Sequence, residues 1–337
     1  MENGVEMDTD KRITLAHGNG GRLMHELIER LRLKFSNKIL DEKTDAAELR
    51  ILKGRIAFST DSFVVKPLFF PGGDIGKLAV FGTVNDLSMK GARPLFISLA
   101  FIIEEGLEFS LLERIAQSIK EASKQAKVEI VTGDIKVVER GSADKIFINT
   151  SGIGLITYPG KPIGACARIN DVIVLNGPIA EHGMAVFQAR EKFGFISDIK
   201  SDCCPLNFDV ERCLTASRHI SVLRDPTRGG LATTLNEIAQ ASNLGVEIYE
   251  KYIPIKPSVK KMCAILGFDP LYIANEGKFV CFVKGKDASK VKQVLAKGAR
   301  IIGRVVSKHR REVYVHTEIG SSRILPMLEF DQLPRIC

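Results

Sequence analysis

The 337-residue sequence lacks the features that would place it in a membrane or outside the cell. No apolar run approaches the ~20 residues that a membrane-spanning helix needs. Residues 1–11 are acidic and polar, without the basic stretch and apolar run of a secretory signal. We therefore expect a cytoplasmic protein with no membrane partner.

The sequence also lacks a cysteine pattern typical of a metal site, because no two of its seven cysteines have C-x-x-C spacing. Cys203 and Cys204 are adjacent, which suits neither a tetrahedral metal site nor a disulfide between them. Four others lie in apolar segments and are interpreted as small core residues: Cys166, Cys213, Cys263 and Cys281. Zinc binding is therefore not expected.

A P-loop is missing as well. Residues 72–78 (GGDIGKL) come near the pattern but lack its G-x-x-x-x-G-K-[ST] spacing, and Leu78 supplies no hydroxyl group for Mg²⁺. The net charge is +8, yet the basic residues are scattered among acidic ones, and the densest basic cluster, 308–311, is predicted to be a turn. We expect no nucleic-acid partner; the excess positive charge would help to attract anionic ligands such as nucleotides.

What the sequence does contain is typical of a globular protein of two domains, with 45% hydrophobic and 26% charged residues. Strands are predicted at 55–59, 95–103, 128–131, 145–156, 172–175, 246–248, 279–283, 300–306 and 312–316. Helices are predicted after residue 21 and at 75–90, 109–127, 180–190, 209–219 and 231–243. Ser110 and Glu113 predict a capping box for the helix at 109–127.

Both halves therefore mix helices with strands, which predicts an α/β or mixed α+β fold. The breaker cluster at 158–162 (YPGKP) marks the expected domain boundary. The predicted parts are an extension at 1–12, domains at 13–158 and 163–318, and a mobile tail at 319–337.

Four aspartates are placed where strands or helices meet loops: Asp45, Asp61, Asp86 and Asp134. Converging carboxylates suit one or two Mg²⁺ ions, which nucleotide enzymes hold with carboxylates and substrate phosphates. Aspartate is also common at caps and turns, and for any one of these residues alone that interpretation is favoured. Asp86 is the exception, because it falls inside an otherwise apolar helix.

Two glycine-rich segments are candidates for phosphate binding. One is the run Gly18, Asn19, Gly20 and Gly21; the other contains Asp225, Arg228, Gly229 and Gly230 just before a predicted helix. Each signal is weak by itself. Lys136 and Glu276 are candidate acid–base groups, although a surface lysine and a surface glutamate are the more common explanation.

Cys337 is the most unusual residue, because a thiol at the end of a chain can enter a pocket as a substrate would. Thiolates are good nucleophiles, and the thiol pKa is near 8.5 unless its surroundings change it. Pro334 and Arg335 would make the preceding segment a semi-rigid arm with a charge for phosphate or carboxylate. A cysteine that stands at this position by chance and has no function is an equally weighted alternative.

Six segments together resemble one family along nearly the whole chain: 17–21 (HGNGG), 67–86 (PLFFPGGDIGKLAVFGTVND), 131–136 (VTGDIK), 225–230 (DPTRGG), 275–278 (NEGK) and 334–337 (PRIC). The chain resembles the HypE family of carbamoyl dehydratases, which act in NiFe hydrogenase maturation. This family is part of the superfamily of aminoimidazole ribonucleotide synthetase (PurM).

The resemblance implies two α/β domains, a homodimer formed through strands of the N-terminal half, and a cleft for ATP and Mg²⁺. It implies that the carbamoyltransferase HypF loads a carbamoyl group onto Cys337. The S-carboxamide would then be dehydrated to a thiocyanate at the expense of ATP, and the cyanide would pass to iron on the HypC–HypD scaffold. Asp45, Asp61, Asp86 and Asp134 would hold Mg²⁺, and Glu276 and Lys136 would be the catalytic bases.

Other functions remain as alternatives. Selenophosphate synthetases have similar aspartates but use a reactive Cys or selenocysteine near the N-terminus, and here no cysteine precedes Cys166. Thiamine monophosphate kinases phosphorylate a small molecule and need no thiol tail. A non-enzymatic maturation adaptor would use the tail only for docking, but it would have no need of the aspartates.

Overall fold

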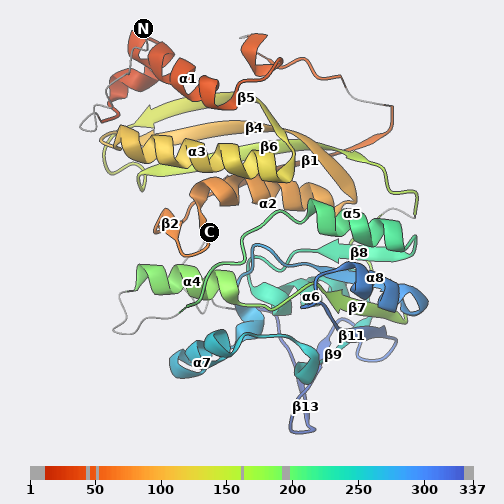
Figure 1. The fold of residues 1–337 in the computed structure, drawn as a ribbon. Coiled ribbons are helices and arrows are strands. Elements are labelled where there is room, and N and C mark those ends of the chain that lie inside the picture. Colours follow the sequence, from red (N-terminus) through yellow and green to blue (C-terminus); the bar gives the residue numbers. More distant parts are fainter. Residues whose placement is uncertain (1–11, 43–45, 51–52, 161–162, 192–197, 330–337) are drawn as a thin grey trace.

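The strands form two main sheets that follow one another in the sequence (Figure 1). The computed structural model describes residues 12–42, 46–50, 53–160, 163–191 and 198–329. The first sheet has the strand order β1-β6-β4-β5, and the second has the order β13-β12-β9-β11-β7-β10-β8. The predicted mixture of helices and strands is confirmed. Among the described residues, no helix is both long and apolar enough to cross a bilayer.

The first sheet is built from four long strands: β1 (Arg55–Phe63), β4 (Ala92–Glu104), β5 (Glu129–Val138) and β6 (Ile146–Ile156). Three helices accompany it: α1 (Arg22–Phe35), α2 (Ile75–Met89) and α3 (Phe109–Ala126). The apolar stripe predicted for α3 is buried, because Leu112, Ile115 and Ile119 are at most 1% exposed. Helix α2 lies between this sheet and the second one (Figure 1). A short hairpin, β2 (Phe69–Phe70) with β3 (Gly73–Asp74), leads into α2.

The two faces of the first sheet differ, because side chains alternate along each strand. Asp61 pairs with Thr150, which pairs with Leu99, and this row faces α2. Ser62 pairs with Asn149 in the neighbouring row, which points to the opposite face. That opposite face carries exposed apolar side chains on β1 and β4, namely Ile56, Phe58 and Ile102. We call it the outer face.

The second sheet contains β7 (Asp171–Leu175), β8 (Ile220–Arg224), β9 (Gly245–Tyr249), β10 (Val280–Lys284), β11 (Arg300–Val306), β12 (Val313–His316) and β13 (Ser322–Ile324). Its helices are α4 (Glu181–Arg190), α5 (Asn207–Ala216), α6 (Gly230–Ser242), α7 (Pro257–Leu266) and α8 (Ala288–Val294). Among the described strands of this second sheet, only β9 and β12 pair in parallel. The basic cluster at 308–311 lies in the turn between β11 and β12, as predicted.

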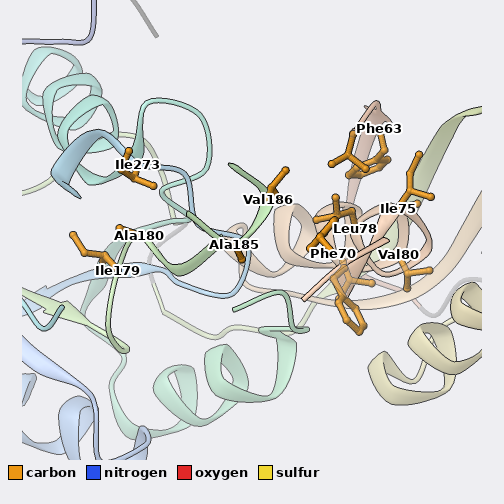
Figure 2. Close-up of a cluster of buried hydrophobic side chains, with 14 of the residues drawn as sticks. Phe63, Phe70, Ile75, Leu78, Val80, Ile179, Ala180, Ala185, Val186 and Ile273 are labelled. Atoms are coloured by element: carbon orange, nitrogen blue, oxygen red, sulfur yellow. The ribbon is translucent and has the colours of Figure 1, made fainter. Parts of the chain in front are cut away.

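A continuous apolar core joins the two halves around α2 and α4. Figure 2 shows Phe70, Ile75 and Leu78 gathered on one side, with Ala185 and Val186 of α4 reaching towards them. These side chains are at most 7% exposed. Burying each large aliphatic or aromatic side chain contributes roughly 1.5–3 kcal/mol to folding, so this core fixes the elements that border the junction.

The prediction of a mobile tail from residue 319 is wrong for its described part. Strand β13 pairs with β12, and Leu325 is fully buried, its N–H donating to the carbonyl of Val313 at 2.8 Å. The Nδ2 of Asn236 donates to the Leu325 carbonyl at 2.9 Å. This segment is ordered by backbone hydrogen bonds at the edge of the sheet. It has no apolar period in its sequence, which is why the prediction missed it. Residues 330–337 lie outside the described residues.

Three other local predictions are also corrected. Strand β1 continues through Asp61 instead of stopping at residue 59, because β6 supplies it with partners throughout. Helix α3 has Glu108 as its N-cap residue without a side-chain cap, so Ser110 lies within its first turn and forms no capping box. Cys166 is exposed and is not a core residue, whereas the other three cysteines interpreted as core residues are buried.

Candidate active site

A cavity of about 230 Å³ lies at the junction of the two sheets, beside the free edge of β1. Four carboxylates from four separate segments line it, together with one arginine and three hydroxyl groups. These residues are Asp61, Asp86, Asp225, Glu276, Arg228, Thr60, Ser62 and Thr227. Sequence positions more than 200 residues apart therefore contribute to one acidic pocket.

The first sheet and α2 supply two of the carboxylates. Asp61 lies on the row of β1 that faces α2, and Asp86 lies near the end of that helix. The Oγ of Ser59 donates to the Asp86 Oδ2 at 2.8 Å and so orients this carboxylate. Asp86 interrupts the apolar pattern of α2 because it faces the pocket.

The loop between β8 and α6 supplies Asp225 and Arg228. It ends in two glycines with left-handed backbone, Gly229 at φ +70° and Gly230 at φ +61°. A Cβ on Gly230 would lie 2.6 Å from the carbonyl oxygen of Leu271, so only glycine fits this turn. Gly229 is the N-cap residue of α6, which begins at Gly230, one residue before the predicted start. The glycines shape the loop, and its Thr227 and Arg228 reach the cavity.

Glu276 belongs to the loop before β10, and it is 7% exposed. The neighbouring Asn275 ties this loop to the Asp225 loop, because its Nδ2 donates to the carbonyl of Pro226 at 2.9 Å. Its Oδ1 accepts the N–H of Ala180 at 2.7 Å. The two loops that bring carboxylates from the second half are therefore cross-linked by one buried amide side chain.

The pocket favours protonated carboxyl groups when nothing else occupies it. Burial, together with the charge of nearby Asp86, raises the pKa of Asp225 to about 7. Burial also raises the pKa of Glu276 well above its usual range, with Asp202 and Asp225 as the largest charge contributions. The pKa of Asp86 is raised by burial, against the opposing hydrogen bond from Ser59. Shifts of this kind, at a concave site, are typical of functional groups.

This donor set fits a hard divalent cation that is shared with a phosphorylated ligand. Carboxylate and hydroxyl oxygens are the ligands that Mg²⁺ prefers, and it is usually held by one or two carboxylates plus phosphates and water. Within the described ranges, no group of three or more His, Cys, Asp or Glu side chains is close enough to hold a metal unaided. Asp61, Asp86 and Asp225 are the carboxylates of the pocket that could share such a cation with the phosphate groups of a ligand.

A second cavity, of about 330 Å³, adjoins the first and shares Asp86, Asp225 and Thr227 with it. Its other lining residues combine an apolar wall with two cations: Ala57, Phe58, Ser59, Leu87, Met89, Lys90 and Arg224. The junction thus presents an acidic pocket continuous with a space that has apolar and basic walls. Such a combination suits a ligand with an organic part and a phosphate part.

Asp134 and Lys136 do not reach this pocket within one chain. Both lie on β5, at the opposite edge of the first sheet from β1. Asp134 pairs with Ala100, which pairs with Asn149, so it points to the outer face. Its carboxylate lies 3.2 Å from the Nζ of Lys136, and both side chains are more than half exposed.

The predicted glycine run is also remote from the acidic pocket. Gly18 packs against β5, where an added Cβ would lie 2.8 Å from the backbone nitrogen of Val137. Gly21 is the N-cap residue of α1. Gly20 and Asn19 precede it, with the Asn19 Oδ1 accepting the N–H of Gly21 at 3.1 Å. Asp45 and Cys337 lie outside the described residues.

Several residues that frame the pocket were missed. Asp202 and Asn85 hold the Glu276 loop, and Lys278 lies 3.1 Å from the Asp202 carboxylate. Two of them could have been found from the sequence. Lys278 comes two residues after Glu276 in the NEGK segment, and Asn85 is a polar residue next to Asp86 in an apolar helix. Asp202 lies in a segment without periodicity, and nothing in the sequence singled it out.

Family models of the AIR synthase related proteins match both halves of the chain. The N-terminal domain model matches residues 43–156, and the C-terminal domain model matches residues 168–316. Carbamoyl dehydratase HypE of Rhodobacter capsulatus is 45% identical, over 97% of this chain and 99% of its own length. Carbamoyl dehydratase HypE of Escherichia coli K12 is 40% identical, over 96% of this chain and 99% of its own length.

Solved structures agree with these similarities. The crystal structure of hydrogenase maturation protein HypE in complex with ATP has a TM-score of 0.92 and 46% identity, covering 96% of this chain and 99% of that chain. The HypE–HypF complex structure has a TM-score of 0.79 and 47% identity, covering 91% of this chain and 100% of that chain. Thiamine monophosphate kinase from Aquifex aeolicus, at 18% identity and a TM-score of 0.61, shares the fold.

Proposed function

Because the chain belongs to the HypE family of AIR synthase related proteins, we propose that it is an ATP-dependent carbamoyl dehydratase of hydrogenase maturation. It converts an S-carboxamide on Cys337 to a thiocyanate, the source of the cyanide ligands of NiFe hydrogenase iron. One observation carries the assignment beyond sequence similarity. The acidic pocket assembles Asp61, Asp86, Asp225 and Glu276 at the junction of the two halves, where a phosphorylated ligand and its cation would fit.

The difficulty of the reaction lies in the amide oxygen, which is a poor leaving group. Transfer of the γ-phosphoryl group of ATP to that oxygen makes it a good one, and its departure as phosphate must be matched by loss of the protons on nitrogen. Arg228 supplies positive charge against the transferred group, and Thr227 supplies a hydroxyl group beside it. Glu276 is the proposed proton acceptor within the cavity, in the ionised form that a bound cation would favour.

Mg²⁺ is the proposed cofactor, with Asp61, Asp86 and Asp225 as its protein ligands. When bound, it would neutralise charge that develops on the phosphate oxygens. The three carboxylates line the same pocket; the pKa of Asp225 is raised by burial and by the charge of Asp86, and that of Asp86 is raised by burial and by the charge of Asp61. A divalent cation relieves this repulsion, which supports a site that is completed by metal.

Cys337 is the proposed carrier of the reacting group, and the PRIC ending supports that role. A substrate tethered to the enzyme turns a bimolecular encounter into an intramolecular one, with a higher effective concentration. The carbamoyl donor would be HypF, in line with the solved HypE–HypF complex of relatives. Delivery of cyanide to a HypC–HypD scaffold and a cytoplasmic location remain proposals that follow from the family alone.

A homodimer is proposed to form through the outer face of the first sheet. Ile56, Phe58 and Ile102 are 51%, 68% and 42% exposed on this face, so three large apolar side chains are open to solvent in the single chain. Closed two-fold dimers bury the same patch on both copies. Asp134 and Lys136 lie on this face too, so the metal and catalytic roles expected for them would require the second copy.

The experiment that tests the function is intact-protein mass spectrometry after incubation with HypF, its carbamoyl supply and ATP. The wild type should gain a carbamoyl group and then lose one water only when ATP is present. Cys337→Ala, the matched control, should bind ATP and gain no adduct.

Two outcomes would contradict the proposal. A carbamoyl adduct that never loses water would indicate an adaptor that only carries the group. A Cys337→Ala variant that keeps full ATP-dependent phosphorylation of thiamine monophosphate would indicate a small-molecule kinase with this fold.

A further inference from the structure

The backbone at Glu276 is held on both sides by buried polar side chains. The Nδ2 of Asn85 donates to the carbonyl of Glu276 at 3.2 Å. The Oδ1 of Asp202 accepts the N–H of Glu276 at 3.1 Å, and its Oδ2 accepts the N–H of Gly277 at 3.2 Å. Asn85 is 2% exposed, and the side chain of Asp202 is 1% exposed.

Asn85 connects the two halves of the molecule at the pocket. Besides Glu276, its Nδ2 donates to the carbonyl of Cys204 at 3.2 Å, and its Oδ1 accepts the N–H of Leu206 at 2.8 Å. All three bonds cross from α2 to the second half of the chain. Asn85 is adjacent to Asp86 on α2. One helix therefore carries both the side chain that holds the Glu276 loop and a carboxylate of the pocket.

Asp202 is held in turn by a chain of charges. Lys278 lies 3.1 Å from its carboxylate and 3.8 Å from that of Glu181, and Glu181 is paired with Lys256 at 2.5 Å. The Asp202 backbone also leaves no room beside Gly277, where an added Cβ would lie 1.9 Å from the Asp202 carbonyl oxygen. The Asp202 carboxylate is therefore paired with a cation and held in the orientation in which it accepts both N–H groups.

Packing alone does not explain these residues. Apolar side chains would fill the same space without the cost of removing an amide and a carboxylate from water. Buried polar groups that are fully satisfied instead specify one arrangement of the segments they join. Here the specified arrangement is that of Glu276 relative to Asp86.

We propose that Asn85 and Asp202 are positioning residues for the dehydration, holding the Glu276 carboxyl group at the acidic pocket by its own backbone. The inference rests on the proposed function of the pocket. It assigns neither residue a contact with substrate. It predicts that both act on the reaction only through Glu276.

The test compares Asn85→Asp and Asp202→Asn, which keep the shape of each side chain but change its hydrogen-bonding groups. Asn236→Asp is the matched control, since Asn236 is another buried helical asparagine with two carbonyl partners, remote from the pocket. Thiocyanate formation is measured in single turnover with carbamoylated protein, and thermal unfolding is recorded for every variant. Each substitution is also combined with Glu276→Gln.

The rate for Asn85→Asp and for Asp202→Asn should fall by about 10-fold to 100-fold, because small misplacements of a reacting group have effects of that size. The KM for ATP should change by less than about twofold, since the nucleotide-binding groups are untouched. In the Glu276→Gln background neither substitution should lower the rate further. Asn236→Asp should keep the wild-type rate in its folded fraction.

A loss that is equal in both backgrounds would overturn the inference, because it would show a route that bypasses Glu276. Wild-type rates in both folded variants would overturn it as well. If one variant fails to fold, the other decides alone, since each removes a different bond to the same peptide. If the wild-type protein forms no thiocyanate, the proposed function is overturned and this inference with it. If the wild type forms thiocyanate and both variants do so at the same rate, only the inference is overturned.

Discussion

The ionisation of Asp225 is coupled to the free energy of unfolding of the protein. Its pKa is raised from 3.8 to about 7 by burial and by the charge of Asp86. The folded state therefore keeps a proton on Asp225 over a pH range in which the unfolded chain has lost it. Stability falls as the pH rises through that range and levels off above the folded pKa.

Asp225→Asn should therefore stabilise the protein above pH 7 and have less effect near pH 5. The amide cannot ionise, so the part of the pH dependence that comes from this group disappears. The measurement is urea unfolding at both pH values in the presence of EDTA, which keeps divalent cations away from the pocket. A gain that is the same at pH 5 and pH 8 would show that the charge of Asp225 is not its cause.

The cysteines differ in exposure enough to predict their reactivity. Cys166 is exposed, while burial raises the pKa of Cys204 and Cys263 to about 11 and that of Cys213 to about 12. The thiolate is the reactive form, so these buried thiols react slowly. Burial also raises the pKa of Cys203 and Cys281 well above its usual range.

Alkylation of the native protein should therefore modify Cys166 first among the described cysteines. Peptide mass mapping after a short iodoacetamide treatment identifies the sites, and Cys166→Ala should remove this early labelling from the described part of the chain. Rapid modification of Cys213 or Cys281 without denaturant would contradict the buried environment described here.

At the residue scale, the sequence singled out several residues that the structure brings together in one cavity. The residues that line the cavity together include Asp61, Asp86, Arg228 and Glu276. Asp86 was recognisable because a carboxylate is unusual inside an otherwise apolar helix. Asp134 was grouped with them from its similar strand–loop context. Its separation depends on the strand order and on the alternation of side chains, which single residues do not reveal.

At the scale of elements, helices were predicted better than strand ends. The apolar stripe of α3 extends over several turns, and the apolar run of α2 lies between a glycine-containing turn and Gly91, so the limits of both are well marked. Strands β1 and β5 run on through Asp61 and Asp134, residues with low strand propensity, because neighbouring strands supply backbone partners. Strand β8 and helices α7 and α8 were missed, since short elements have too few residues to establish a period.

The outer face of the first sheet leads to a prediction for β1. Phe58→Glu should give a monomer, because it places a charge within the apolar face proposed to be buried between two copies. Phe58 is 68% exposed in the single chain, so the substitution should leave the fold of the monomer intact. Sedimentation analysis of both proteins tests this, with circular dichroism as the check on folding. A dimer of unchanged stability would show that another surface is used.

At the scale of the whole molecule, the two halves of the predicted metal site lie on opposite faces of one sheet. Asp61 and Asp86 face the junction with the second half, and Asp134 with Lys136 faces outwards. The pocket extends around the free edge of β1, where Thr60 and Ser62 of the outer face also line it. A second copy packed on that face is the arrangement by which β5 residues would approach the pocket.

Mixing two inactive variants distinguishes this arrangement from one in which each chain works alone. Asp86→Asn should lose ATP turnover with its fold intact, and Asp134→Asn should do the same if its carboxylate serves the site. When the two are mixed under conditions of subunit exchange, about half of the dimers are mixed, and one of the two pockets in each would be intact if Asp134 acts across the dimer. ATP turnover should then return to about a quarter of the wild-type value, by the same statistics. No recovery, with exchange verified by differently tagged chains, would mean that Asp134 acts within its own chain or not at all, and full activity of Asp134→Asn alone would remove it from the site.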